Sequence, residues 1–146
     1  MLIEMLAVET SGLDPEKDHV LEWAAGRYDT RKRSCTTDHG YIIPPKDYQF
    51  SPEILTYHAE LLPELFTAET SPMLVGPAHL RVMWSKAFCL PFLAPDLQKL
   101  YGPALDGQTM LNLWCARGNR EPHTPRPRAL AKVENMALAL HKSCKE

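Results

Sequence analysis

Residues 2–15 read LIEMLAVETSGLDP, an apolar run that ends in turn-forming residues. A short apolar run followed by Gly, Asp and Pro predicts a β-strand over residues 2–8 that leads into a turn. Residues two apart on a strand lie on the same face of the sheet. We therefore expect the side chains of Ala7 and Glu9 to point to the same side, directly before the turn.

Two further strands are predicted after this turn. Residues 19–28 (HVLEWAAGRY) and 35–43 (CTTDHGYII) have strand-like content, and the polar linker DTRKRS joins them. The first three strands should therefore form a meander. A fourth, short strand is expected over residues 81–84.

The rest of the chain is predicted to be mainly helical. Ser51 is suited to cap a helix with Pro52 in its first position, and a second helix is expected near Pro63. Further helices are expected over residues 86–93 and 95–101, near 109–110, and from Pro127 onward with the apolar stripe Leu130, Val133, Ala137 and Leu140. Three strands followed by alternating helix and strand predict an α/β sandwich with a mixed β-sheet.

Length and composition indicate one soluble domain over residues 1–146. The chain is 45% hydrophobic and 23% charged, unlike a disordered sequence, and its length is typical of one compact core. No apolar run approaches the ~20 residues that cross a bilayer, so no membrane association is expected and a cytoplasmic location is the default. The four cysteines are far apart in the sequence, which predicts free thiols rather than zinc ligands or disulfides.

Three motifs resemble those of the DEDD 3′-to-5′ exonucleases, the DEDDh-type group that includes proofreading subunits. Residues 7–15 (AVETSGLDP) resemble D-x-E-T-T/S-G-L-D-P, residues 84–93 (WSKAFCLPFL) resemble N-x-x-F-D-x-x-F-L, and residues 127–133 (PRALAKV) resemble H-R-A-L-x-D-V. Residues 57–59 also resemble an H-G-I stretch of the family. This resemblance implies a ribonuclease-H-like three-layer sandwich, its mixed β-sheet flanked by helices.

The resemblance also implies where catalytic residues would lie. Such enzymes use two Mg²⁺ or Mn²⁺ ions held by carboxylates, with a histidine as general base. At the five corresponding positions the chain has Ala7, Glu9, Cys89, Pro127 and Lys132, and only Glu9 matches the family. Alanine cannot ligate, a neutral thiol is a poor magnesium ligand, lysine repels cations and proline carries no base. No metal cofactor is therefore expected.

Two other residues are the nearest candidates to replace the missing groups. Asp106 is expected instead to cap the helix near residues 109–110, and His123 lies between prolines in a predicted loop. A second hypothesis concerns Lys132, which can pair with Glu9 across the vestigial site. The alternative is that Lys132 points to solvent on the last helix.

Five residues correspond to nucleotide-binding positions of the family: Thr10, Ser11, Gly12, Leu13 and His58. The resemblance implies that they hold a terminal nucleotide. Structural roles explain them equally well, since Gly12 suits a turn with positive φ and Leu13 suits packing.

Two functions follow from this sequence. The first is a catalytically inactive exonuclease-like protein, a pseudoenzyme that binds a protein partner or single-stranded nucleic acid and so inhibits or regulates another enzyme. The second is a residual metal-dependent 3′-to-5′ exonuclease centred on Glu9, helped by Asp14 or Asp106. Net charge is −2, and the basic segments 31–33 and 117–128 are candidate contact loops. The sequence indicates neither the partner nor the oligomeric state.

Overall fold

The computed structural model of this protein describes residues 1–121 and 124–145. The strands are β1 (Leu2–Thr10), β2 (Val20–Asp29), β3 (Ser34–Tyr41), β4 (Leu80–Met83) and β5 (Leu105–Asp106). The helices are α1 (Pro52–Tyr57), α2 (Leu61–Leu65), α3 (Lys86–Cys89), α4 (Pro95–Tyr101), α5 (Gly107–Arg117) and α6 (Ala129–Ser143), with a short 3₁₀ helix, η1, over Leu90–Phe92.

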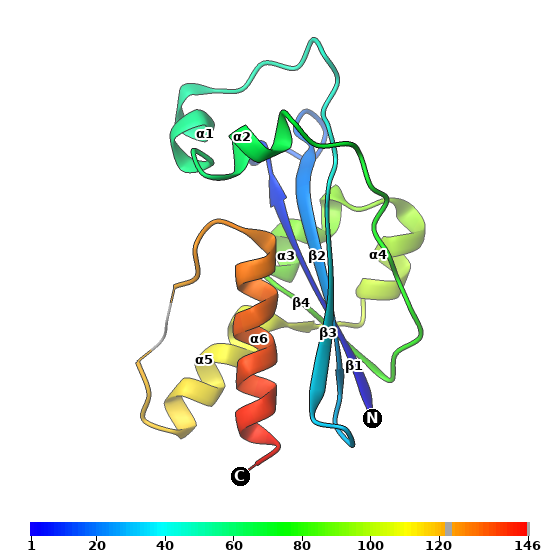
Figure 1. Ribbon diagram of the computed structural model, residues 1–146, viewed down its shortest axis with the longest axis vertical. Helices are drawn as coiled ribbons and strands as arrows, with labels where there is room; N and C mark the ends of the chain where they lie inside the picture. The colour runs from blue at the N-terminus through cyan, green and yellow to red at the C-terminus, as the bar shows by residue number, and fades with distance from the viewer. Residues whose placement is uncertain (122–123, 146) are drawn as a thin grey trace.

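The five strands form one mixed sheet in the order β3-β2-β1-β4-β5. β1 pairs antiparallel with β2 and β2 with β3, whereas β4 pairs parallel with β1 and β5 parallel with β4. Figure 1 shows α5 and α6 on one side of this sheet, α4 on the other, and α1 and α2 beyond the end toward which β1 points. This arrangement confirms the predicted three-layer α/β fold.

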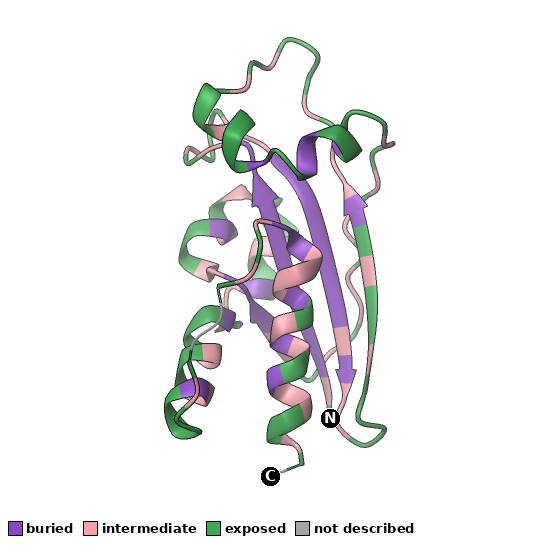
Figure 2. Cartoon of the chain, turned by 60° about the vertical axis from the view of Figure 1, so that its left-hand side comes forward, coloured by how far each residue is buried: buried purple, intermediate pink, exposed green. Residues whose placement is uncertain are grey.

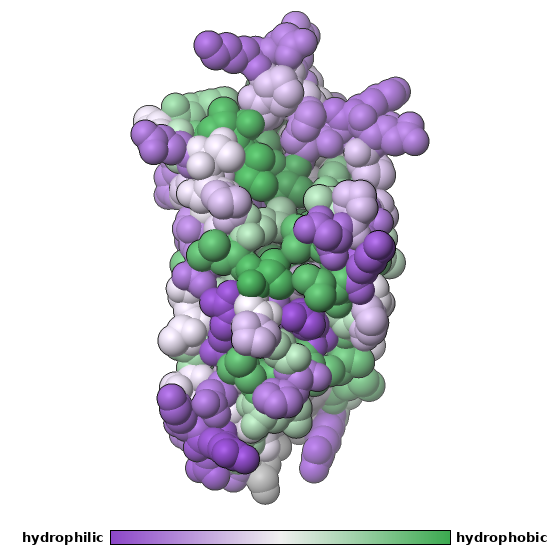
Figure 3. Space-filling view, turned by 90° about the vertical axis from the view of Figure 1, so that its right-hand side faces the viewer, coloured by the Kyte–Doolittle hydropathy of each residue, from purple (hydrophilic) through white to green (hydrophobic). Residues whose placement is uncertain are grey.

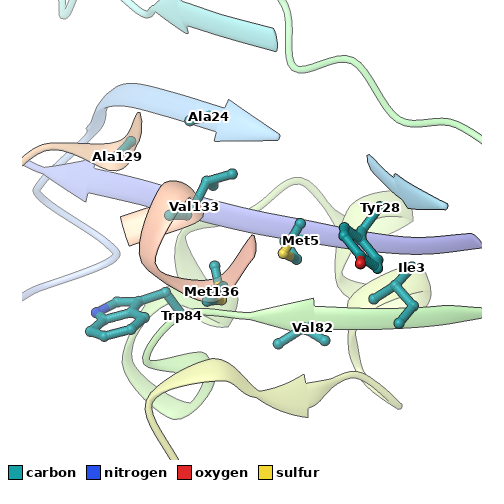
Figure 4. Packing of buried hydrophobic residues seen from close by; sticks show 10 residues of the cluster. Ile3, Met5, Ala24, Tyr28, Val82, Trp84, Ala129, Val133 and Met136 are labelled. Atoms are coloured by element: carbon teal, nitrogen blue, oxygen red, sulfur yellow. The ribbon is translucent and has the colours of Figure 1, made fainter. Parts of the chain in front are cut away.

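One core lies between the sheet and α6. Val133 and Met136 of α6 pack against Met5 of β1 and Ala24 of β2, all of them completely buried (Figure 4). The period of two along β1 puts Met5, Ala7 and Glu9 on this same face. The first turn of α6 therefore lies over the C-terminal end of β1.

A second core lies on the opposite face of the sheet. Leu6 and Val8 of β1 pack there against Cys89, Leu93 and Tyr101. Figure 2 shows β1 and β2 buried along almost their whole length, whereas the edge strand β3 is largely exposed. Figure 3 shows apolar side chains gathered across the middle of the face that carries α4, with hydrophilic side chains toward both ends.

Most predicted elements are present, with shifted ends. Ser51 caps α1, because its side chain accepts a hydrogen bond from the Ile54 amide. Pro127 does not start the last helix as predicted: α6 begins at Ala129 with Arg128 as its N-cap. The four residues of the predicted stripe on α6 all pack against the first core, although Leu130, Ala137 and Leu140 are only partly buried.

Two elements have little or no counterpart in the prediction. β5 is only two residues long, and α5 extends over eleven residues where a helix was expected only near 109–110. Within the described part of the chain, no helix is long and apolar enough to cross a membrane.

Candidate functional site

A cleft of about 1160 Å³ opens at the end of β1. Its walls come from the last residues of β1 and the following turn, from α1, from α3 and from the start of α6. The pairing of β1 with β2 shifts register between Glu9 and Thr10, and β1 ends at Thr10. After Thr10 the chain leaves the sheet in a turn, and residues 11–13 of this turn line the cleft.

Hydrogen bonds fix the turn that follows β1. The Ser11 amide donates to the His19 carbonyl at 2.8 Å, and the His19 amide donates to Ser11 Oγ at 2.9 Å. The Asp18 carboxylate accepts from the Asp14 amide at 3.0 Å and from the Tyr48 hydroxyl at 2.8 Å. The turn is thus tied to β2 and to the loop before α1, so it presents a defined wall to the cleft.

Gly12 lies in this turn, but the proposed need for positive φ is wrong, since no described glycine has a positive φ. The glycine is required by close approach instead. A Cβ at this position would lie 2.2 Å from Asp18 Oδ2. Only a residue without a side chain lets the Asp18 carboxylate keep both of its hydrogen bonds.

Glu9 and Lys132 form an ion pair in the cleft, which confirms the hypothesis of a salt bridge between them. The Glu9 side chain is 4% exposed and that of Lys132 is 12% exposed. Burial raises the pKa of Glu9 above its ordinary value, although the Lys132 ammonium opposes this rise. The Lys132 ammonium thus lies where a metal ion bound to Glu9 would lie, and Glu9 is the one acidic residue that matches the family motif.

Cys89 also lines the cleft, at the end of α3. It is 3% exposed, and burial raises the pKa of its thiol to about 12. The thiol is therefore protonated at neutral pH and does not offer the thiolate that binds metals.

The remaining two catalytic positions do not line the cleft. Ala7 is completely buried in the core beneath α6, and Pro127 lies just before the Arg128 cap of that helix. The structure thus brings together Glu9, Cys89 and Lys132 but leaves Ala7 and Pro127 outside the cleft wall.

Of the two candidate replacements, only Asp106 lies among the described residues, and its carboxylate is not free. Asp106 caps α5 as predicted: its Oδ2 accepts from the Thr109 amide and hydroxyl, both at 2.8 Å, and its Oδ1 accepts from the Lys86 amide at 2.8 Å. His123 lies outside the described residues.

All five predicted nucleotide-binding residues line the cleft, namely Thr10, Ser11, Gly12, Leu13 and His58. A purely structural role for Leu13 required that it pack in a core. This is wrong, because 83% of the residue is exposed. His58 is 1% exposed, and its Nε2 donates to the Thr10 carbonyl at 2.9 Å. Burial lowers the pKa of His58, so the ring is neutral at pH 7 and its Nδ1 is an acceptor.

This Nδ1 atom has no hydrogen-bond partner among the residues that the structure describes. Buried polar atoms are usually paired, and because this atom is buried it is an unsatisfied acceptor inside the fold rather than a contact on the open surface of the cleft.

The sequence did not reveal a second ion pair beside the first. Glu22 is the register partner of Glu9 on β2 and is completely buried. It accepts from Arg128 Nε at 2.9 Å, from Arg128 Nη2 at 2.8 Å, from the Ala129 amide at 2.6 Å and from His39. Burial raises the pKa of Glu22, but these hydrogen bonds outweigh it and leave the pKa below its ordinary value.

This donor set does not fit the two divalent cations that the family resemblance implies. Glu9 is bound by Lys132, Cys89 is a neutral thiol, and Ala7 and Pro127 contribute no ligand atom. Across residues 1–121 and 124–145, no cluster of three or more His, Cys, Asp or Glu side chains is arranged to hold a metal ion.

Comparisons with known proteins give the fold. A full-length 3′-exonuclease is 15% identical, with a TM-score of 0.61 over 99% of this chain and 81% of its own. The nuclease domain of 3′hExo, a DEDDh family member bound to rAMP, is 14% identical, with a TM-score of 0.62 over 97% and 92%. The zinc-bound complex of E. coli ExoI with single-stranded DNA is 15% identical, with a TM-score of 0.68 over 97% and 40%.

No family model matches the chain, and no curated protein matches it by sequence. At 14–15% identity these likenesses establish a shared ribonuclease-H-like exonuclease fold. A shared fold does not determine activity, which depends on the residues of the cleft.

Proposed function

We propose that this protein is a pseudo-exonuclease: it has the exonuclease fold, does not hydrolyse phosphodiesters and acts by binding. The observation that carries the proposal is the buried ion pair between Glu9 and Lys132. A cation covalently fixed on α6 replaces the exchangeable divalent cations that hydrolysis requires.

Electrostatics supports this proposal over residual catalysis. Two-metal hydrolysis needs several carboxylate oxygens that together hold two ions about 3.5–4 Å apart. A divalent ion approaching Glu9 would have to displace the Lys132 ammonium and then remain beside it. Repulsion between these positive charges strongly disfavours metal binding, because the neighbouring carboxylate of Glu22 is already paired with Arg128.

The residual-exonuclease alternative depends on help for Glu9 from Asp14 or Asp106. Both oxygens of Asp106 are used to hold α3 and α5, and Asp14 does not line the cleft. Asp14 Oδ1 also accepts from the Glu16 amide at 3.0 Å. No observation therefore favours this second function.

The decisive experiment is a cleavage assay on 3′-labelled and 5′-labelled single-stranded DNA and RNA, with Mg²⁺ or Mn²⁺. We expect no shortening of any oligonucleotide beyond that seen with Glu9→Ala, prepared in parallel as the control for contaminating nucleases. Metal-dependent cleavage by the native protein that disappears in Glu9→Ala would overturn the proposal.

The binding partner, a protein or a single-stranded nucleic acid, is part of the same proposal. A cytoplasmic setting is proposed as well, and the four cysteines, free in the described structure, fit a reducing compartment.

A further inference from the structure

The charge of the cleft disfavours a polyanion. Glu9 and Lys132 neutralise each other, so the remaining charged residues of the lining, among those that the structure describes, are Asp18, Asp47 and Glu53 against Lys17. Three acidic groups against one basic group leave a net charge of −2. Nucleic-acid sites carry the opposite sign, because Lys and Arg must neutralise phosphates.

In an exonuclease of this fold an acidic cleft can hold a phosphate because divalent cations lie between the two. The donor set here does not fit such cations, so in the described lining only Lys17 offsets the acidic residues Asp18, Asp47 and Glu53. The acidic side chains of the cleft would repel a negatively charged phosphodiester, whereas they would attract a lysine or arginine side chain.

The walls of the cleft offer apolar anchoring positions. Tyr57 of α1 is 57% exposed, Phe88 of α3 is 39% exposed, and Leu13 projects from the turn after β1. Each comes from a different element, so they surround the cleft rather than form one stripe. Exposed aromatic residues on rigid elements are typical of the positions that dominate protein interfaces.

Size agrees with an extended occupant. The volume of about 1160 Å³ exceeds the roughly 300–1,000 Å³ of small-molecule sites.

We propose that the cleft binds a segment of a partner protein in which an apolar or aromatic residue is flanked by lysine or arginine. This inference rests on the proposed function, because it requires a cleft free of divalent cations. It assigns the protein alternative rather than the nucleic-acid alternative to this site.

The test is a selection from a displayed random peptide library against the full chain, followed by affinity measurements on synthetic copies of the selected peptides. We expect enrichment of Leu, Phe or Trp next to Lys or Arg. Tyr57→Ala and Phe88→Ala should each weaken binding by about tenfold or more, as expected for interface anchors. Asp47→Lys combined with Glu53→Lys should weaken it further.

Leu113→Ala is the matched control, since Leu113 is 67% exposed on α5 and does not line the cleft. It should leave the affinity unchanged, and thermal unfolding of every variant checks that the fold is retained. A labelled dT12 oligonucleotide in EDTA serves as the competing probe and should not bind measurably.

Two outcomes would overturn the inference: a selection that yields no peptide sensitive to Tyr57→Ala, or dT12 binding that Tyr57→Ala abolishes. Either can occur while the cleavage assay stays negative, so failure of this inference is distinguishable from failure of the proposed function.

Discussion

Removing either partner of the Glu9–Lys132 pair should destabilise the fold, and removing both should largely restore it. Glu9→Gln and Lys132→Met are suitable changes because each keeps the size of the side chain while removing its charge. In Glu9→Gln the Lys132 ammonium stays in a position only 12% exposed, and in Lys132→Met the Glu9 carboxylate stays in one only 4% exposed.

The expected magnitude follows from this burial. Truncating one partner of a fully buried pair costs about 3–5 kcal/mol, because the other charge is left uncompensated. The cleft is open to water on one side, so we expect about 2–3 kcal/mol for each single change. The double variant should lie within about 1 kcal/mol of the native protein, since neutral replacement of a buried pair is often tolerated.

Urea unfolding of the four proteins at pH 7 measures this double-mutant cycle. We expect equal m-values and a coupling energy of at least about 3 kcal/mol, because two single losses of about 2–3 kcal/mol each are set against a loss of at most about 1 kcal/mol in the double variant. A coupling energy near zero would refute the reasoning, because the two side chains would then not interact in solution.

The pH dependence gives an independent check. Burial raises the pKa of Glu9, and Lys132→Met removes the charge that opposes this rise. A carboxyl group whose folded-state pKa is raised contributes stability below its unfolded pKa and loses it as pH rises through the folded value. The deficit of Lys132→Met relative to the native protein should therefore grow from pH 5 to pH 8, and the double variant should show no such growth.

Three further changes test other parts of the structure. Arg33, exposed in the turn before β3 with φ of 53°, should favour glycine, so Arg33→Gly should stabilise by about 1 kcal/mol in urea unfolding while Arg33→Ala should not. Hydrogen bonding from Arg128 lowers the pKa of Glu64 to about 2, so the stability that ionised Glu64 contributes is lost as pH falls from about 4.5 toward 2. In acid titrations the Glu64→Gln protein should therefore lose less stability over this range than the native protein. The difference should be under about 1 kcal/mol because Glu64 is half-exposed. Gly12→Ala should cost about 1–3 kcal/mol because its Cβ displaces the Asp18 carboxylate, and a melting temperature equal to that of the native protein would contradict this.

Local signals in the sequence were sufficient for the elements with strong patterns. The β1 strand and its turn, the Ser51 cap and the apolar stripe of the last helix each depend on residues close together in the chain. The two-residue strand β5 could not be predicted, since it is too short to show any periodicity. Pro127 was predicted at the start of the last helix because proline suits the first helical position, but the helix begins two residues later, at Ala129.

The site was predictable only where motif positions fixed it. Two such positions suggested the ion pair between Glu9 and Lys132 as one of two alternatives, whereas Glu22 and Arg128 are 106 residues apart with no pattern that links them. The apolar anchor Tyr57 was not identified as exposed, because exposure depends on how α1 lies against the rest of the fold.

The two ion pairs are best understood as one arrangement. Glu9 and Glu22 are register partners on adjacent strands, so their carboxylates lie close together on a buried face and repel each other. Arg128 is the N-cap of α6 and Lys132 lies in the first turn of that helix, and each brings one cation to one of the two carboxylates. A change of Lys132 to aspartate would therefore not simply recreate a metal ligand. It would place a third carboxylate beside Glu9 and Glu22 with only Arg128 to offset them, so the Lys132→Asp protein should be less stable than Lys132→Met unless a divalent cation binds.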